Sequence, residues 1–276
     1  MKRILLGLGG TPLTRVATDQ AMALAIRHQA ALTGTTVVDR RRLSQVGIFP
    51  AGAGQAAQRV LNRRLTITEE AVERAIASFQ YLCWEAGVQS QVLREEGDPF
   101  QVMAKQSRFH DLSIFSLRSL FDYGIVEDPH DALYRILIQG VGPVLGVGPD
   151  SGAVRRIFFG WDGSDAATRA LKHLVLLRPW PEAQLHLIRF HSPQQSSQAR
   201  KSIHQAVDFC LEHDMQAEFS LSLQSPYRSF LPSAEEWGAD LIALGCTGRN
   251  PLTRNVVPDL ALQTIKTWNR SVFMAT

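Results

Sequence analysis

The chain has 276 residues, 45% of them hydrophobic and 20% charged, and this length favours two domains over one. A net charge of +3 without a long run of Lys and Arg argues against nucleic-acid binding, and no apolar stretch approaches the length of a membrane span. The three cysteines, Cys83, Cys210 and Cys246, lie far apart and match no disulfide or zinc spacing.

The N-terminus reads MKRILLGLGGTP, and its short apolar run ends at Gly9, Gly10 and Pro12. We interpret it as a buried β-strand rather than a signal peptide, because the run is short and is broken by turn-forming residues. Together with the cysteine pattern, this indicates a cytoplasmic protein.

Strands and helices are predicted to alternate along the chain. Continuous apolar runs indicate strands buried on both faces of a parallel sheet, and apolar residues at helical spacing, such as Val72, Ile76 and Phe79, indicate helices. In the first half the predicted strands are 3–9, 35–39, 89–95, 112–117 and 143–148, and the predicted helices are 12–25, 72–86, 99–107 and 131–139.

The second half repeats the layout of the first. The segment ILLGLGGTPLTRVA, which begins at Ile4, aligns with IFFGWDGSDAATRA, which begins at Ile157, and Cys83 later aligns with Cys210. The first half is longer by an insertion at residues 40–64. Internal similarity of this kind indicates that one structural unit occurs twice.

We therefore predict two tandem domains, 1–150 and 151–276. Each is expected to be α/β, with a doubly wound, five-stranded parallel sheet of the Rossmann-like type, because strands alternate with helices and the crossovers are short.

This pattern resembles the universal stress protein family in its tandem two-domain form. The resemblance rests on the doubled layout and on IFFGWDGSDAATRAL, which contains Asp162, Gly163 and Ser164. It implies a fold that binds adenosine nucleotides, with strand order 3-2-1-4-5 and pairing through the fifth strand. It also implies a nucleotide signature, G-x2-G-x9-G-[S/T], after the fourth strand.

The candidate nucleotide-binding residues that follow from this resemblance lie in the second half: Asp162, Gly163, Gly245, Gly248, Arg249 and Arg254. Asp162 would accept hydrogen bonds from an adenine amino group or ribose hydroxyls, the glycines would admit phosphate to backbone N–H groups, and the arginines would add positive charge. The alternative is that Gly245 only ends a strand and Asp162 only caps the helix predicted at 164–177.

The end of the signature argues against a bound triphosphate. Pro258 and Asp259 stand where glycine and a hydroxyl residue are expected, so one N–H donor is lost and a carboxylate takes its place. A carboxylate about 5 Å from a phosphate charge costs on the order of 3 kcal/mol, or roughly a hundredfold in affinity per unit charge. Binding of ATP is therefore expected to be weak or lost, and ADP, AMP or adenosine remain as ligands of the second half.

The first half departs further from the signature. Ser116 and Ser119 stand in place of the two glycines, and Gly9 replaces the acid. Pro129 and His130 replace the last pair of the signature, and we interpret His130 as a capping or surface residue rather than a ligand or a base. We therefore expect no nucleotide site in the first half.

Other chemistries lack a motif. The chain has no GxGxxG, no GK[ST] and no GxSxG sequence, so we assign no catalytic residue and no metal ligand. The remaining histidines are scattered and are interpreted as structural or exposed. The first functional hypothesis is a non-catalytic stress protein that binds a small molecule or a protein partner. The second is an ATP-binding switch, or a slow ATPase, that uses the second half alone.

The last strand of each half, PVLGVG at 143–148 and SVFMAT at 271–276, is expected at a sheet edge. We predict that the two strands pair within the chain and form an internal pseudo-dimer. A homodimer is a further alternative.

The insertion at 40–64 contains a predicted short helix, 55–61, and an apolar tip at Ile48 and Phe49. One hypothesis is that it folds over the first-half crevice or onto the second half, with Ile48 and Phe49 buried. The alternative is a solvated connector.

Overall fold

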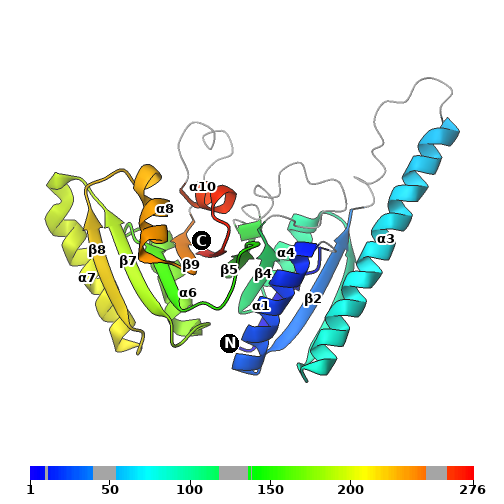
Figure 1. Ribbon diagram of the computed structural model, residues 1–276, viewed down its shortest axis with the longest axis horizontal. Helices are drawn as coiled ribbons and strands as arrows, with labels where there is room; N and C mark the ends of the chain where they lie inside the picture. The colour runs from blue at the N-terminus through cyan, green and yellow to red at the C-terminus, as the bar shows by residue number, and fades with distance from the viewer. Residues whose placement is uncertain (10–11, 40–53, 118–135, 138, 247–259) are drawn as a thin grey trace.

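In the computed structural model, the described residues are 1–9, 12–39, 54–117, 136–137, 139–246 and 260–276. Strands and helices alternate through both halves (Figure 1). The elements of the first half are β1 (Arg3–Gly7), α1 (Pro12–His28), β2 (Ala31–Val38), α3 (Gly54–Glu85), β3 (Ser90–Glu96), α4 (Pro99–Ser107), β4 (Leu112–Ser116) and β5 (Val144–Val147).

Among the described residues, the second half repeats this series and adds one short 3-10 turn, η1, and the helix α10 between its last two strands. Its elements are β6 (Arg156–Gly160), α6 (Asp165–Leu177), β7 (Gln184–Phe190), η1 (Pro193–Gln195), α7 (Ser196–Glu212), β8 (Ala217–Ser222), α8 (Pro226–Trp237), β9 (Leu241–Gly245), α10 (Leu260–Thr267) and β10 (Ser271–Ala275).

The ten strands form one sheet in the order β3-β2-β1-β4-β5-β10-β9-β6-β7-β8. Each half thus has the predicted order 3-2-1-4-5, and the second is reversed so that the two fifth strands meet. Pairing within each half is parallel, whereas β5 and β10 pair antiparallel through Leu145 and Phe273. The predicted strand order and the predicted pairing of the last strands are both confirmed.

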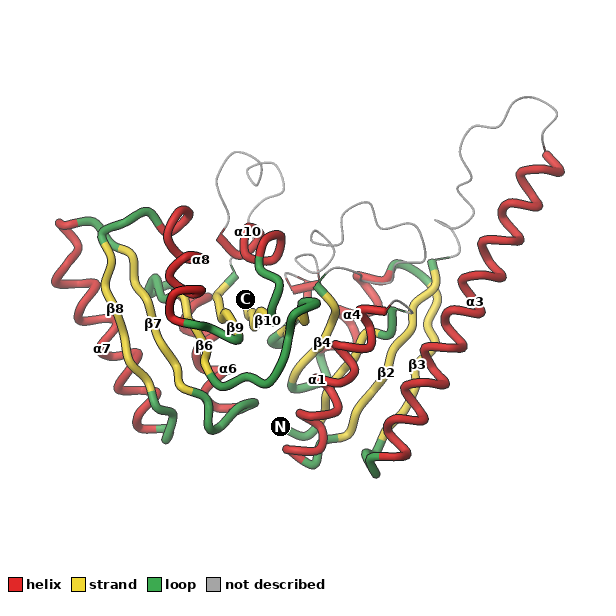
Figure 2. Tube along the Cα trace, in the orientation of Figure 1, coloured by secondary structure: helices red, strands yellow, loops and turns green. Residues whose placement is uncertain are grey.

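The sheet lies between two layers of helices (Figure 2). Residues of α1, α3, α6 and α7 pack into one buried cluster, and residues of α4, α8 and α10 pack into another. Strand β1 shows why both faces are covered: Ile4 and Leu6 belong to the first cluster and Leu5 to the second. A strand whose side chains alternate between two apolar layers must be apolar throughout, as the sequence is here.

The internal repeat extends to matching hydrogen bonds of side chains. Asp111 and Asp240 each precede the fourth strand of their half. The Asp111 carboxylate accepts the backbone N–H groups of Lys2 and Arg3 at 2.5 and 2.9 Å. The Asp240 carboxylate accepts those of Arg155 and Arg156 at 2.9 and 3.0 Å. Each aspartate therefore fixes the start of the first strand of its half beside the fourth.

The structure corrects the prediction for the insertion. Residues 54–64 do not form a separate short helix but begin α3, which continues to Glu85 and extends beyond the sheet at one end (Figure 1). Helix α3 is longer than the predicted helix, 72–86, because no helix-breaking residue interrupts it. Val60 is 38% exposed, so this part of the insertion is not packed against the crevice. Ile48 and Phe49 lie outside the described residues.

The pairing of β5 with β10 predicts the behaviour of isolated halves. Residues 1–150 and 151–276, expressed separately, would each expose an apolar edge strand, and we expect both to self-associate or aggregate. Light scattering after size-exclusion chromatography measures this directly. If both halves are well-behaved monomers, the strand pairing is dispensable and the expectation is wrong.

Asp111 predicts a pH-dependent contribution to stability. Burial by itself raises the pKa of the Asp111 carboxyl, but the N–H groups of Lys2 and Arg3 outweigh it and hold the pKa below its usual value. A lowered folded-state pKa stabilises the protein above the unfolded-state pKa of about 3.9, and this contribution is lost as the pH falls through the folded-state value. Asp111→Asn should therefore lower the free energy of unfolding by about 1 kcal/mol at pH 7, and by less below pH 4.

Urea unfolding at several pH values tests this prediction, with Asp150→Asn as the matched control. Asp150 is exposed, and only its backbone N–H is engaged, with the carbonyl of Asn269 at 3.0 Å. A destabilisation by Asp111→Asn that does not change with pH would contradict the assigned role.

Candidate ligand-binding site

The candidate site lies at the carboxyl ends of β6 and β9, which are neighbours in the sheet. The chain leaves β6 toward β7 on one side, while β9 and β10 lie on the other side. Ligands in open α/β sheets bind at such a reversal of strand order, because the connecting loops diverge there and leave a crevice. The location expected from the sequence is therefore the location of a pocket in the structure.

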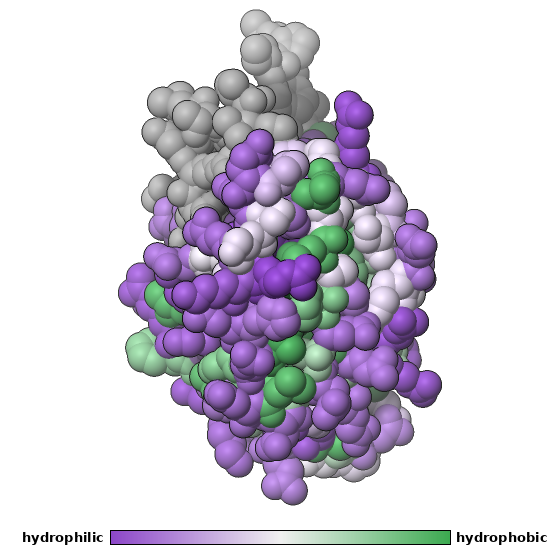
Figure 3. Space-filling model, turned by 90° about the vertical axis from the view of Figure 1, so that its left-hand side faces the viewer, coloured by the Kyte–Doolittle hydropathy of each residue, from purple (hydrophilic) through white to green (hydrophobic). Residues whose placement is uncertain are grey.

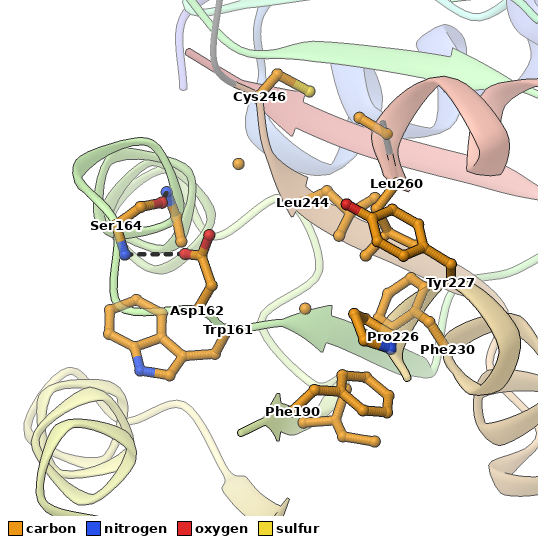
Figure 4. Close-up of a pocket in the computed structure, with 15 residues that line it drawn as sticks. Trp161, Asp162, Ser164, Phe190, Pro226, Tyr227, Phe230, Leu244, Cys246 and Leu260 are labelled. Carbon is orange, nitrogen blue, oxygen red and sulfur yellow. Dashed lines mark hydrogen bonds between the residues drawn. The ribbon is translucent and has the colours of Figure 1, made fainter. Parts of the chain in front are cut away.

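The pocket has a volume of about 210 Å³; most of the residues that line it are apolar, while polar and apolar atoms contribute about equally to its surface. Asp162 and Ser164 lie on one side, and Leu244, Tyr227 and Leu260 face them across the cavity (Figure 4). The lining residues are Gly160, Trp161, Asp162, Ser164, Ala167, Ile188, Phe190, Pro226, Tyr227, Phe230, Leu244, Gly245, Cys246, Leu260 and Ala261.

The polar side of the pocket is a turn that leads from β6 into α6. Ser164 is the N-cap of α6, and its side chain accepts the N–H of Ala167 at 3.2 Å. Asp162 does not cap the helix itself, as one interpretation of the sequence held. Its Oδ1 instead accepts the N–H of Ser164 at 2.8 Å and so holds the N-cap residue in place. The exposed Asp162 carboxylate keeps acceptor capacity toward the pocket.

Gly245, at the end of β9, has a packing role that the sequence did not reveal. A Cβ at this position would overlap the backbone of Ala166 and Ala167 in the first turn of α6. The strand end therefore lies against the helix N-terminus, and only glycine fits between them. This contact accounts for Gly245 without a phosphate.

Gly163 also has a local structural reason. Its φ of +79° lies in the region that favours glycine, and a Cβ would lie 2.7 Å from Arg189 Nη1. The Arg189 guanidinium packs over this turn and donates to the Ser202 hydroxyl, which also accepts the Trp161 indole N–H at 3.3 Å. Gly163 thus shapes the turn that carries Asp162.

The structure brings together only part of the predicted site. Asp162, Gly163 and Gly245 lie around the same turn and strand end. Gly248, Arg249 and Arg254 lie outside the described residues, as do Pro258 and Asp259. Their predicted relation to a phosphate group stays a prediction.

Sequence reasoning missed the apolar walls of the pocket. Phe190 ends β7, and Tyr227 and Phe230 lie on the first turns of α8. The available signal was the repeat, since Pro226-Tyr227 aligns with Pro99-Phe100. It gave no hint of a pocket, because aromatic residues at such positions are typical of any core.

The corresponding aromatic residue of the first half is buried. Phe100, which matches Tyr227, is 3% exposed, whereas Tyr227 is 37% exposed. Leu117 and the matching Cys246 are both buried, so the difference lies at the ring position. Ser119, Pro129 and His130 lie outside the described residues. The two halves share a fold but use this position differently: the ring borders a pocket in one and belongs to the core in the other.

In the part of the chain that the structure describes, no group of three or more His, Cys, Asp and Glu residues is placed to hold a metal ion. Among the same residues, no helix combines the length and the apolar character that crossing a membrane requires.

Comparisons with known proteins give matches only to solved structures; no protein-family profile and no curated protein matches the chain. A universal stress protein from Archaeoglobus fulgidus DSM 4304 is 15% identical, with 99% of this chain and 96% of that chain covered and a TM-score of 0.68. The chain has the fold of a universal stress protein. At this identity the likeness concerns the fold along nearly the whole chain, including its tandem arrangement.

Smaller universal stress proteins match part of the chain. One that was solved in complex with cAMP is 19% identical, with 44% of this chain and 95% of that chain covered and a TM-score of 0.40. Another, from Lactobacillus plantarum, is 17% identical, with 52% and 94% covered and a TM-score of 0.36. Each is covered almost completely by about half of this chain.

The packing of Gly245 gives a prediction for this universal stress protein fold. Gly245→Ala should lower the free energy of unfolding by about 1–3 kcal/mol, because its Cβ meets backbone atoms that cannot rotate away. Urea denaturation measures the effect. Gly152→Ala is the control, since a Cβ there has nothing within 4 Å, and it should change stability by less than about 0.5 kcal/mol. If Gly245→Ala leaves the free energy of unfolding unchanged, the packing explanation is wrong and a role of this glycine in ligand binding is favoured.

Proposed function

We propose that the chain is a stress-response protein of the universal stress type, and that it binds a small ring-containing ligand of the nucleoside class in the pocket of its second half. The observation that carries this proposal is the pocket itself, at the reversal of strand order, with aromatic and aliphatic side chains among its lining residues and one carboxylate at its edge.

The walls suit a flat heterocycle. Phe190, Phe230 and Leu244 supply apolar surface, and the Tyr227 ring is partly exposed at the border. Asp162 stands opposite with acceptor capacity for ribose hydroxyls or an exocyclic amino group (Figure 4). An adenine nucleoside has both of these parts, an apolar ring and hydrogen-bond donors beside it.

The size of the pocket argues for a nucleoside rather than a nucleoside triphosphate. Its volume of about 210 Å³ lies below the roughly 300–1,000 Å³ that is common for drug-sized ligands. A phosphate tail would extend out of it toward the segment after β9, where the sequence places Pro258 and Asp259. Gly245, the first glycine of the family signature, is already accounted for by its contact with α6.

Binding without catalysis at this pocket is supported by its residue types. Among the described lining residues there is no histidine, lysine or arginine to act as a base or to stabilise developing negative charge. The Asp162 carboxylate is already engaged with the Ser164 N–H. We therefore propose that the pocket recognises its ligand and does not transform it.

The state of the three cysteine thiols supports a proposal for the compartment in which the protein acts. Cys83, Cys210 and Cys246 are all buried, and none of the three forms a disulfide in the part of the chain that the structure describes. Burial raises the pKa of the Cys210 thiol to about 12, so this thiol stays protonated and unreactive at neutral pH. We propose a reducing compartment, the cytoplasm, as the place of action.

An ATP-binding switch that uses the second half alone is the second candidate function. Asp162 is in place at the end of β6, and Gly248, Arg249 and Arg254 continue the sequence pattern that a phosphate site needs. The two candidates differ in what the phosphate groups contribute to binding.

Titration calorimetry of the full chain with adenosine, AMP and ATP·Mg²⁺ tests the proposal. Adenosine should bind at least as tightly as ATP·Mg²⁺. Asp162→Asn keeps the acceptor for the Ser164 N–H but removes the charge, and should weaken adenosine binding about fivefold, or about 1 kcal/mol. Tyr227→Ala should weaken it roughly 3- to 10-fold.

Tyr81→Ala is the matched control, because Tyr81 is a 58%-exposed tyrosine on α3, outside the pocket, and should leave the affinity unchanged. ATP·Mg²⁺ binding tenfold tighter than adenosine, and abolished by Gly248→Glu, would favour the switch. No binding of any of the three would refute nucleoside recognition.

A further inference from the structure

A second cluster of reactive groups lies away from the pocket, on β7 and β8. His186 Nε2 lies 2.8 Å from the Ser220 hydroxyl oxygen, and His186 Nδ1 lies 3.0 Å from Glu218 Oε1. A hydroxyl, an imidazole and a carboxylate are thus joined in a line. This is the order of contacts that activates a serine nucleophile in hydrolases.

The sheet register explains how three separate residues meet. His186 pairs with Glu218, and Ile188 pairs with Ser220. Glu218 and Ser220 are two positions apart on one strand, so both side chains point to the same face, and the histidine reaches between them. Phe219, between them, packs against His204 of α7 on the opposite face, with ring centroids 4.7 Å apart.

The hydrogen bonds fix the tautomer of the histidine. A carboxylate only accepts hydrogen bonds, so the proton toward Glu218 must be on Nδ1. In the neutral ring Nε2 is then an acceptor, and the Ser220 hydroxyl donates to it. Nε2 is therefore ready to take the Ser220 proton.

The imidazole is held in place by packing. It stacks on Phe158 with ring centroids 5.3 Å apart and an interplanar angle of 11°, and Trp237 lies at 5.3 Å on another side. The Trp237 indole N–H also donates to Glu218 Oε1 at 3.0 Å. The hydrogen bonds from His186 and Trp237 hold the pKa of the Glu218 carboxyl below its usual value, so it is ionised at neutral pH.

The cluster lies at an open edge of the sheet. β8 is the last strand in the order. The Leu185 N–H donates to the Gln216 carbonyl and the His191 N–H donates to the Ser222 carbonyl, and these two bonds show which residues of β8 are hydrogen-bonded to β7. Residues 218, 220 and 222 then bond to β7, and the N–H of Leu221 faces the free edge. Figure 3 shows this side of the molecule, where hydrophobic residues form an interrupted strip among hydrophilic ones.

We propose that Ser220, His186 and Glu218 form an esterase-type site that accepts short acyl groups from activated carboxylic esters. Ser220 is the nucleophile, His186 the base, and Glu218 a positioning residue that acts through His186. Ser220 is half-buried and the Glu218 carboxylate is exposed, so a small ester would approach them from the sheet edge, where the outward N–H of Leu221 would donate to its carbonyl oxygen.

The chemistry balances without a cofactor. Ser220 Oγ forms a bond to the ester carbonyl carbon while its proton moves to His186 Nε2. The carbon–oxygen bond to the alcohol then breaks, and the alcohol leaves with that proton. A water molecule attacks the acyl-serine by the same route and releases the carboxylic acid, which restores the hydroxyl.

The test uses the full chain and two probes, a fluorophosphonate and p-nitrophenyl acetate. The fluorophosphonate should label one site, which peptide mass spectrometry should locate at Ser220. Ser220→Ala should lose both the label and the release of p-nitrophenol. Ser222→Ala is the matched control, since Ser222 is on the same strand and face, where its side chain accepts the Gln224 N–H, and it should keep both.

The Glu218→Gln variant tests whether the Glu218 carboxylate positions His186 for catalysis or only stabilises the fold. The charged groups that face the imidazole are the Glu218 carboxylate and, beyond Trp237, the Arg156 guanidinium, 4.3 Å from the Trp237 ring. Without the carboxylate the rate should fall roughly tenfold or more, and the acid limb of the pH–rate profile should move to lower pH. The labelling experiment uses the folded wild-type protein and needs no variant. Failure to label Ser220, or labelling of another residue, would overturn the proposal. So would a pH–rate profile that is the same in Glu218→Gln as in the wild-type protein.

Discussion

The antiparallel pairing of β5 with β10 is the interaction on which the rest of the structure depends. Each of these strands ends a five-stranded sheet, and each is buried along its whole length. Three residue pairs join them, from Val144 with Met274 to Gly146 with Val272. A Cβ at Gly148, just after β5, would overlap the backbone of Asn269, so the two segments are in direct contact. The pairing converts two half-proteins with open edges into one continuous sheet with a shared core.

The pairing joins two halves that differ at the matching position of the fold. In the first half Phe100 is 3% exposed and belongs to the buried core, whereas the matching Tyr227 of the second half is 37% exposed and lines the pocket. The second half also has the exposed Asp162 carboxylate where the first half has Gly9. The same fold thus has a buried ring in one half and a pocket in the other.

Most of the fold could be predicted from the sequence, because its signals are local. The helix at 99–107 matches α4, and its start follows from Asp98, whose side chain accepts the N–H groups of Phe100 and Gln101. Continuous apolar runs identified the strands, because parallel strands covered on both faces must be apolar. Helix α3 was predicted as two separate helices, 55–61 and 72–86, because the exposed segment between them carries no clear apolar stripe, whereas the structure has one continuous helix.

The site was less predictable, because its parts meet only through tertiary packing. The sequence identified Asp162 but not its partner, since the contact with the Ser164 N–H depends on the turn after β6. It left Gly245 open between a phosphate site and the end of a strand, and only the structure shows the close approach of β9 to α6 that gives this glycine a packing reason. His186, Glu218 and Ser220 form no motif along the chain, and they meet only through the register of β7 with β8.

The central claim is that the second half, and not the first, binds a nucleoside at the crevice between β6 and β9. A crystal structure of the full chain grown with adenosine tests it most directly. The account predicts electron density for the purine against Phe190, Phe230 and Leu244, ribose hydroxyls within hydrogen-bond distance of Asp162, and no density at the corresponding crevice of the first half. Adenosine bound in the first half, or an empty second-half pocket at a saturating adenosine concentration, would contradict it.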